Sequence, residues 1–329
     1  MQRAWNRFLL FLFNNSIIGV LVVSCLVMGL LSDKFFTLRN WKNILDNFSV
    51  PGIVSLGVAV VVIAGGIDLS FGSILACCAI LATWLQPHSL WIPVVGTILL
   101  GGFLGWINGM IITRLDTNPL ITTLGTQWLF FAVLLIVTKG NLVQGNTDNL
   151  FHFIGQGKIF GFPFPIYLFV ATCLLAWFVL RKTWLGKYIY AHGSRKDALY
   201  CAGINSKNVY LAAFVFMGLI IGIGGLLFSS RMIGVRPTDG DQYLLRVLTA
   251  VILSGVSLNG GIGSVVNVLI AVIVLGVIDN SMVLLGIQYK NQQMIRGCVF
   301  ILSIIYNNFM VKQGDIFARK PCSPAEREA

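Results

Sequence analysis

Two acidic residues lie among apolar residues, where a carboxylate is unusual. Asp68 occurs in the segment GGIDLS, Gly65–Ser70, between two apolar runs. The N–H groups and the dipole at the start of a helix stabilise a carboxylate. The favoured interpretation is therefore that Asp68 or Ser70 caps a helix that begins near Phe71. The alternative is a proton or cation site, because acids inside membrane segments are commonly functional.

The second acid, Asp279, lies beside Asn280 in the apolar range 264–285, with Asn267 earlier in the same range. It can bond a neighbouring helix or line a polar pathway, and the sequence leaves both interpretations open. Neutral polar groups on several helices suit a polar, uncharged solute that is held weakly. We see no convergent charged or aromatic set that predicts a high-affinity site. The predicted translocation path consists of Asp68, Asn108, Thr123, Thr126, Gln127, Asn267, Asp279 and Asn280.

The elements that must position these residues are predicted to be membrane helices. Of 329 residues, 57% are hydrophobic and 11% are charged, and the mean hydropathy is +0.84. Soluble domains contain about a quarter charged residues. The fold class is therefore all-α, a polytopic membrane protein that forms a single transmembrane domain over residues 1–329. Ten apolar spans are predicted, at 8–31, 48–64, 71–85, 91–113, 119–138, 163–180, 209–229, 247–258, 264–285 and 293–311.

The longest break in this apolar pattern is the basic loop Arg181–Asn208, which contains six Lys or Arg residues and one acid, Asp197. Ser194 and Asp197 have the spacing of a capping box, and Gly203 suits a left-handed helix end. A helix is therefore predicted over 195–202. Ten spans place both termini on one side of the membrane. The concentration of basic residues in the loop and at the termini makes that side the cytoplasm, together with a tail over 312–329.

Several functional classes are disfavoured by the sequence. The formal net charge of +11 is typical of basic loops beside anionic lipid, and the basic and aromatic residues are not interleaved as in single-stranded nucleic-acid binding. The sequence has no GxxxxGK[ST] motif, and its histidines, cysteines and acids lack metal-site spacing. The chain is expected to need no cofactor or metal and to be no enzyme.

Four ordered motifs resemble a known family. They are GGIDLSFGSI (65–74), NPLITTLGT (118–126), GKYIYAHG with ALYCAGIN (186–205) and AVILSGVSLNGGIGS (250–264). Together they resemble the permease subunits of bacterial ABC importers for monosaccharides, the ribose, xylose, galactofuranose and autoinducer-2 group of the branched-chain-type permeases. The likeness covers roughly residues 35–309. It implies a fold similar to the cobalamin-importer permease, with about ten helices per subunit and two subunits per transporter.

The resemblance also implies partners and a coupling site. A periplasmic sugar-binding protein delivers the solute, a second permease subunit completes the path, and a separate ATP-binding subunit docks on the loop helix. Small residues allow close docking, and basic residues orient the encounter. The residues that match the family's pattern are Gly193, Ala198, Ala202, Gly203, Ile204 and Asn205. With Ser194, Arg195, Lys196 and Asp197 they form the predicted ATPase-coupling set.

The chain also departs from the family pattern. His192-Gly193-Ser194 stands where Gly-Gly-Asn is usual, and Leu244-Leu245-Arg246 stands where many members have Glu-Leu-Asp. Asn267 and Asp279 replace a common glycine and asparagine. The second change removes two acids and adds a cation near an outer loop, so the sequence names no specific sugar and leaves open a pairing with a different permease.

The leading hypothesis is a multi-pass permease subunit in the bacterial inner membrane that carries a monosaccharide and is driven by a separate ATPase. A proton-coupled secondary transporter that uses Asp68 or Asp279 is the first alternative. A passive channel or a structural membrane partner is the second.

Overall fold

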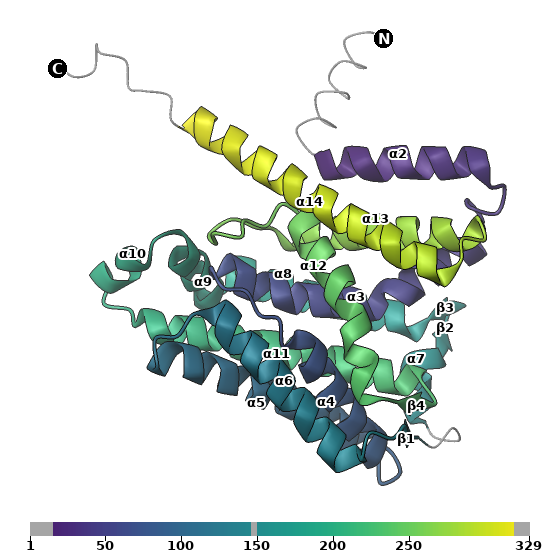
Figure 1. The fold of residues 1–329 in the computed structure, drawn as a ribbon, viewed down its shortest axis with the longest axis horizontal. Coiled ribbons are helices and arrows are strands. Elements are labelled where there is room, and N and C mark those ends of the chain that lie inside the picture. The colour runs from purple at the N-terminus through teal and green to yellow at the C-terminus, as the bar shows by residue number, and fades with distance from the viewer. Residues whose placement is uncertain (1–15, 146–149, 319–329) are drawn as a thin grey trace.

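The computed structural model describes residues 16–145 and 150–318, and these are mostly helical (Figure 1). The long helices pack side by side, and short turns or brief irregular segments join them. The helices are α2 (Ser16–Leu31), α3 (Leu38–Ile63), α4 (Phe71–Leu85), α5 (Trp91–Arg114), α6 (Pro119–Thr138), α7 (Phe151–Gln156), α8 (Phe164–Lys182), α9 (Trp184–Ser194), α10 (Lys196–Cys201), α11 (Ser206–Arg231), the 3-10 helix η1 (Pro237–Tyr243), α12 (Leu244–Leu253), α13 (Val265–Leu284) and α14 (Tyr289–Ala318).

Every predicted apolar span overlaps one of these helices. Six helices of the described residues are long and apolar enough to cross a membrane, namely α3, α5, α6, α8, α11 and α13. The count of ten membrane-spanning helices stays a prediction, because α4 and α12 are short and residues 8–15 of the first span lie outside the described residues. The chain is thus a polytopic helical membrane protein by the length and composition of its helices.

Two predicted helix boundaries are wrong. Helix α3 begins at Leu38 rather than Phe48, because Thr37 caps it by accepting a hydrogen bond from the N–H of Asn40 at 3.3 Å. Helix α12 ends at Leu253 rather than Leu258, where Gly255 adopts a φ of +76°. The predicted tail over 312–329 begins inside α14, which continues to residue 318, and residues 319–329 lie outside the described part.

The core centres on α11, which packs against α3, α4 and α5. Close approach to α5 depends on glycine, since a Cβ at Gly218 would meet the carbonyl of Gly101. A similar close contact occurs at Gly225, because a Cβ there would meet Cys78 on α4. Small residues allow membrane helices to pack at short distance.

The two ends of the molecule differ. Helices α9 and α10 lie at one end, called here the loop end, and α7 and the strands lie at the other, called the strand end (Figure 1). Two-residue strands, which the all-α prediction missed, form two antiparallel pairs. These pairs are β1 (Val143–Gln144) with β4 (Gly234–Val235), and β2 (Lys158–Ile159) with β3 (Phe162–Pro163).

Candidate functional site

The basic loop contains two helices where the sequence predicted one. Helix α10, Lys196–Cys201, corresponds to the predicted range 195–202. Helix α9 was missed, although it has its own signals. Thr183 caps it by accepting from the N–H of Gly186 at 3.4 Å, and its buried residues Gly186, Ile189 and His192 recur every third position. The predicted capping role of Ser194 is wrong, because Ser194 is the last residue of α9 and Arg195 separates the two helices.

The predicted end of α10 is confirmed. Gly203 has a φ of +72°, its N–H donates to the carbonyl of Tyr200, and the N–H of Ile204 donates to that of Leu199, each at 2.9 Å. These bonds form a Schellman motif, in which a left-handed glycine satisfies the last carbonyls of a helix. Asn205 then caps α11 by accepting from the N–H groups of Lys207 and Asn208. Of the predicted coupling residues, Gly193 and Ser194 lie in α9, Lys196, Asp197 and Ala198 lie in α10, and the rest lie in the connections before and after α10.

Three glycines join this loop to two distant turns. Gly193 in α9, Gly65 after α3 and Gly260 after α12 meet in what we call the glycine junction. A Cβ at Gly260 would lie 2.7 Å from the Cα of Gly65 and 2.9 Å from that of Gly193. Since only glycines fit at this spacing, the loop contacts the ends of two separate helical segments.

Hydrogen bonds reinforce the glycine junction. The N–H of Gly261 donates to the carbonyl of Ile63 at 2.8 Å, which joins the two turns. His192 and Tyr190 of α9 donate to the carbonyls of Ala64 and Gly263, each at 2.8 Å. The imidazole of His192 also stacks on Tyr210 of α11, with ring centroids 4.6 Å apart. Helix α9 is therefore firmly bonded to the transmembrane helices.

Asp68, Asn108 and Thr123, all predicted path residues, lie close together around the turn that precedes α4. Asp68 is fully buried, and its Oδ1 accepts from the N–H and the hydroxyl of Ser70, both at 2.6 Å. Asn108 donates to Asp68 Oδ2 at 3.1 Å and to the Ser70 hydroxyl at 2.7 Å. The predicted helix start at Phe71 is confirmed, and Ser70 is the N-cap residue of α4. The Ser70 side chain makes no cap hydrogen bond, however, and Asp68 Oδ1 accepts from the N–H of Ser70, which precedes the helix.

Helix α6 supplies the adjoining polar groups. The Thr123 hydroxyl accepts from the N–H of Leu69 at 3.2 Å and donates to the carbonyl of Ile67 at 3.3 Å. Thr126 donates back to the carbonyl of Thr123, and Gln127 takes part through its main-chain carbonyl, which accepts from Ser73 at 2.9 Å. These groups brace the turn that contains Asp68.

Asp279 and Asn280 belong to a second group near the strand end. They border a cavity of about 490 Å³, called here the polar basin, between α3, η1, α12, α13 and α14. Asn280 exchanges two amide hydrogen bonds with Asn40, each 2.9 Å long. Asn267, in the first turn of α13, is not among the basin residues. Apart from Asn267, the predicted path residues therefore form two groups, near opposite ends of α3.

Three arginines in the polar basin were missed by the sequence reasoning. They are Arg231, Arg246 and Arg296, and the aromatic residues Phe48, Tyr243 and Tyr289 border the same cavity. The expectation that no charged or aromatic groups converge is therefore wrong. Two features of the sequence could have indicated this cluster. Arg246 is a cation added relative to the family pattern, and Arg296 lies within an apolar span. A single sequence does not reveal which helix faces meet.

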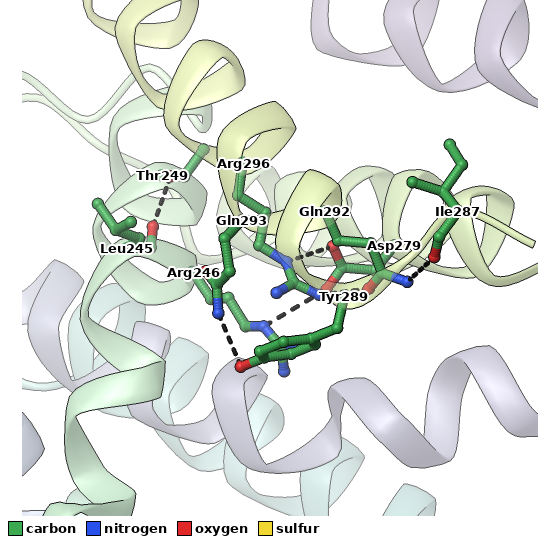
Figure 2. Close-up of polar contacts among 9 residues, drawn as sticks. All are labelled: Leu245, Arg246, Thr249, Asp279, Ile287, Tyr289, Gln292, Gln293 and Arg296. Atoms are coloured by element: carbon green, nitrogen blue, oxygen red, sulfur yellow. Dashed lines mark hydrogen bonds and ion pairs between the residues drawn. The ribbon is translucent and has the colours of Figure 1, made fainter.

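Asp279 lies between two of these arginines (Figure 2). The Nε of Arg296 on α14 donates to Asp279 Oδ1 at 2.9 Å, and the Nε of Arg246 on α12 lies 3.4 Å from Oδ2. The Asp279 and Arg296 side chains are only 14% and 11% exposed. Partly buried charges require such pairing, because an unpaired charge away from water is costly. One carboxylate thus links three helices.

Comparison with known proteins identifies the family. Residues 40–304 match the model described as "Branched-chain amino acid transport system / permease component". The chain is 34% identical to the ribose import permease protein RbsC of Escherichia coli (strain K12) over 299 residues, which covers 89% of this chain and 92% of the relative. Identity to the RbsC protein of Haemophilus influenzae is 33% over 297 residues, covering 88% and 91%.

A relative with another sugar in its name is similarly close. The L-arabinose transport system permease protein AraH of Escherichia coli (strain K12) is 32% identical over 312 residues, covering 94% of this chain and 93% of the relative. No solved structure matches the chain. The resemblance seen in the four motifs is confirmed: the chain belongs to the branched-chain amino acid transport system permease family, with monosaccharide ABC permeases among its relatives.

Proposed function

We propose that the chain is the membrane-spanning permease subunit of a bacterial ABC importer for a monosaccharide. Its relatives are named for ribose import and L-arabinose transport. They are transport permeases rather than enzymes, and this sequence has no P-loop. ATP hydrolysis therefore belongs to a separate ATP-binding subunit, whose action the permease converts into movement of its own helices.

The observation that carries this proposal is the glycine junction. Helix α9 is bonded to the turn after α3 and to the turn after α12 through Gly193, His192 and Tyr190. A partner that moves α9 and α10 would therefore move two helical segments at once. Helix α10 offers the contact surface, and Tyr200 on it is 83% exposed. A rigid contact of this kind suits alternating access that is driven by a partner protein bound to α9 and α10.

The orientation follows from the coupling role. The loop end is the cytoplasmic side and the strand end faces the periplasm, and we expect both termini in the cytoplasm. The long helix α14 begins beside the polar basin and extends 30 residues along the molecule from there. At 1.5 Å per residue it is long enough to reach the other side of a membrane.

The two polar groups then mark the two ends of a path. The polar basin receives solute from a periplasmic sugar-binding protein, and the Asp68 group lies toward the cytoplasm. A second permease subunit, identical or different, completes the path. The outward apolar faces of helices such as α6, where Trp128 is 66% exposed, meet this subunit or membrane lipid.

The proton-coupled alternative fits the acids less well. Asp68 is fully buried and accepts three hydrogen bonds from Ser70 and Asn108. Both oxygens of Asp279 face arginines. Neither carboxylate is arranged as an open proton carrier, so an external energy source explains the arrangement better.

The test is a mild-detergent purification of the tagged chain from native membranes, with each co-purifying protein identified by mass. The proposal expects an ATPase with a Walker motif. If the chain purifies alone, and reconstituted vesicles still accumulate sugar without ATP, the proposal is wrong.

A matched pair of variants tests the docking surface. Tyr200→Ala at the loop end is expected to reduce recovery of the ATPase about tenfold, which corresponds to about 1.4 kcal/mol. Phe160→Ala removes an exposed aromatic side chain at the strand end and is expected to leave recovery unchanged. Equal recovery with both variants would contradict docking on α10.

A further inference from the structure

We propose that the polar basin binds an anionic, hydroxylated solute, namely a monosaccharide that carries a carboxylate. This inference rests on the proposed function, because it names the substrate class of that importer. The charges around the basin, which were not predicted from the sequence, support it.

The basin has an excess of one positive charge. Arg231, Arg246 and Arg296 border it, with Asp279 as the acid in its wall. Arg231 is neutralised by Asp46, since its Nη2 lies 2.9 Å from Asp46 Oδ2. Among the described residues, Asp279 then remains as the single acidic partner of two guanidinium groups. A bound monoanion would neutralise the remaining positive charge of the basin, whereas a neutral sugar would leave one arginine without a counter-charge.

The two arginines do not share Asp279 equally. Arg296 donates to it at 2.9 Å and also to Gln292 at 3.3 Å (Figure 2). Arg246 lies 3.4 Å away, and its buried Nε has no hydrogen-bond partner among the described residues. A buried donor without an acceptor is costly. Arg246 is thus the less fully paired arginine and, at 23% against 11%, the more exposed one, so its terminal N–H groups are best placed to receive a ligand carboxylate.

Arginine is also the right side chain for this ligand. Its planar guanidinium presents paired N–H donors that match the two oxygens of a carboxylate. The basin lies near the strand end, so an anion entering from that side meets Arg246 without crossing the membrane core. Asp279 limits the attraction, because a fully uncompensated pair of arginines would hold an anion too tightly to release it.

The other basin residues suit the hydroxyl groups of a sugar. Asn43, Asn47 and Gln242 are exposed and carry both donors and acceptors, and Phe48 and Tyr243 provide apolar surface. The cavity of about 490 Å³ lies within the range of small-molecule sites, which is about 300–1,000 Å³. This combination is typical of a site for a compact polar solute.

The experiment compares two probes that differ in one group, D-glucuronate and D-glucose. Each radiolabelled probe is dialysed to equilibrium against the purified full-length chain in uncharged detergent at neutral pH. We expect glucuronate to bind at least about tenfold more tightly than glucose. Its binding should weaken as NaCl is raised from about 0.05 M to about 0.5 M, because salt screens the attraction.

Three variants identify the residues responsible. Arg246→Gln is expected to abolish the preference for glucuronate, and Arg246→Lys to weaken it, because lysine keeps the charge but loses the paired donors. Asp279→Asn removes the competing acid and is expected to strengthen glucuronate binding. Lys207→Gln, an exposed cation at the loop end, is the control and should change nothing. A thermal melt checks that each variant is folded.

Equal binding of the two probes, binding of neither, or an Arg246→Gln variant that still prefers glucuronate would each overturn the inference. None of these results would affect co-purification of the ATPase, which tests the proposed function separately. Conversely, a chain that binds glucuronate but purifies without an ATPase would keep the binding site and reject the importer.

Discussion

The imidazole Nδ1 of His192 lies 2.8 Å from the main-chain oxygen of Ala64, although 128 residues separate them in the sequence. A carbonyl only accepts, so His192 is the donor. This bond attaches the basic loop to the turn after α3. Beside it, Gly193 fits against Ile63 and Gly261 so closely that a Cβ would overlap both. Contact between the loop and the membrane helices therefore depends on particular small residues.

Gly193→Ala is expected to impair transport strongly. The added methyl group has no space at the glycine junction, and such overpacking costs about 1–3 kcal/mol. Thermal unfolding in detergent and ATP-driven uptake in vesicles measure the two effects. Gly125→Ala in α6 is the control, because a Cβ at Gly125 meets nothing within 4 Å. Equal uptake by both variants would contradict the role of the junction.

Gly203→Arg is expected to abolish transport while leaving membrane insertion intact. A Cβ at Gly203 meets nothing within 4 Å, so the arginine projects from the end of α10 into the proposed docking surface. The backbone at residue 203 has a left-handed φ of +72°, so a residue with a Cβ there adds about 1–2 kcal/mol of local strain.

The control for this variant is Gly140→Arg. Gly140 has a similar φ of +70° and equally open surroundings, but it lies after α6. It therefore carries the same strain without altering α10. ATPase activity of the assembled complex and uptake in vesicles are the measurements, and equal loss in both variants would assign the effect to strain alone.

Asp68→Ala is expected to destabilise the chain. It removes the acceptor for the Ser70 N–H and for Asn108, which would leave buried donors unpaired. Unpaired buried groups cost about 1–3 kcal/mol each. Thermal unfolding should show a clear decrease. Asp116→Ala removes an exposed acid from a surface ion pair with Lys207 and should change stability by less than about 1 kcal/mol. Similar melting of both variants would contradict a structural role for Asp68.

Arg296→Gln is expected to destabilise more than Arg246→Gln. Arg296 makes the shorter contact with Asp279 and is the more buried of the two arginines. Its loss leaves Asp279 with one partner at 3.4 Å. Combining each variant with Asp279→Asn in a double-mutant cycle isolates the two pair energies. A larger coupling for Arg246 than for Arg296 would show that the geometry is misassigned.

The sequence alone determined the features that depend on near neighbours. Apolar runs predicted a helix at every span, because a segment without charges buries its backbone polar groups only by bonding them internally. Gly203 was recognised as the end of α10, since a left-handed glycine has a local signature. The four motifs also identified the family, because they occur in order over most of the chain.

Only the tertiary structure decided which distant groups meet. Gly65, Gly193 and Gly260 lie far apart in the sequence, yet they form one junction. Arg246 and Arg296 looked like isolated cations, yet they share Asp279. Ser194 had the spacing of a cap but ended α9 instead, because packing of α9 against the turns extended that helix. Such contacts depend on how helices rotate and pack against each other, which involves residues far apart in the chain and leaves no periodic signal in the sequence.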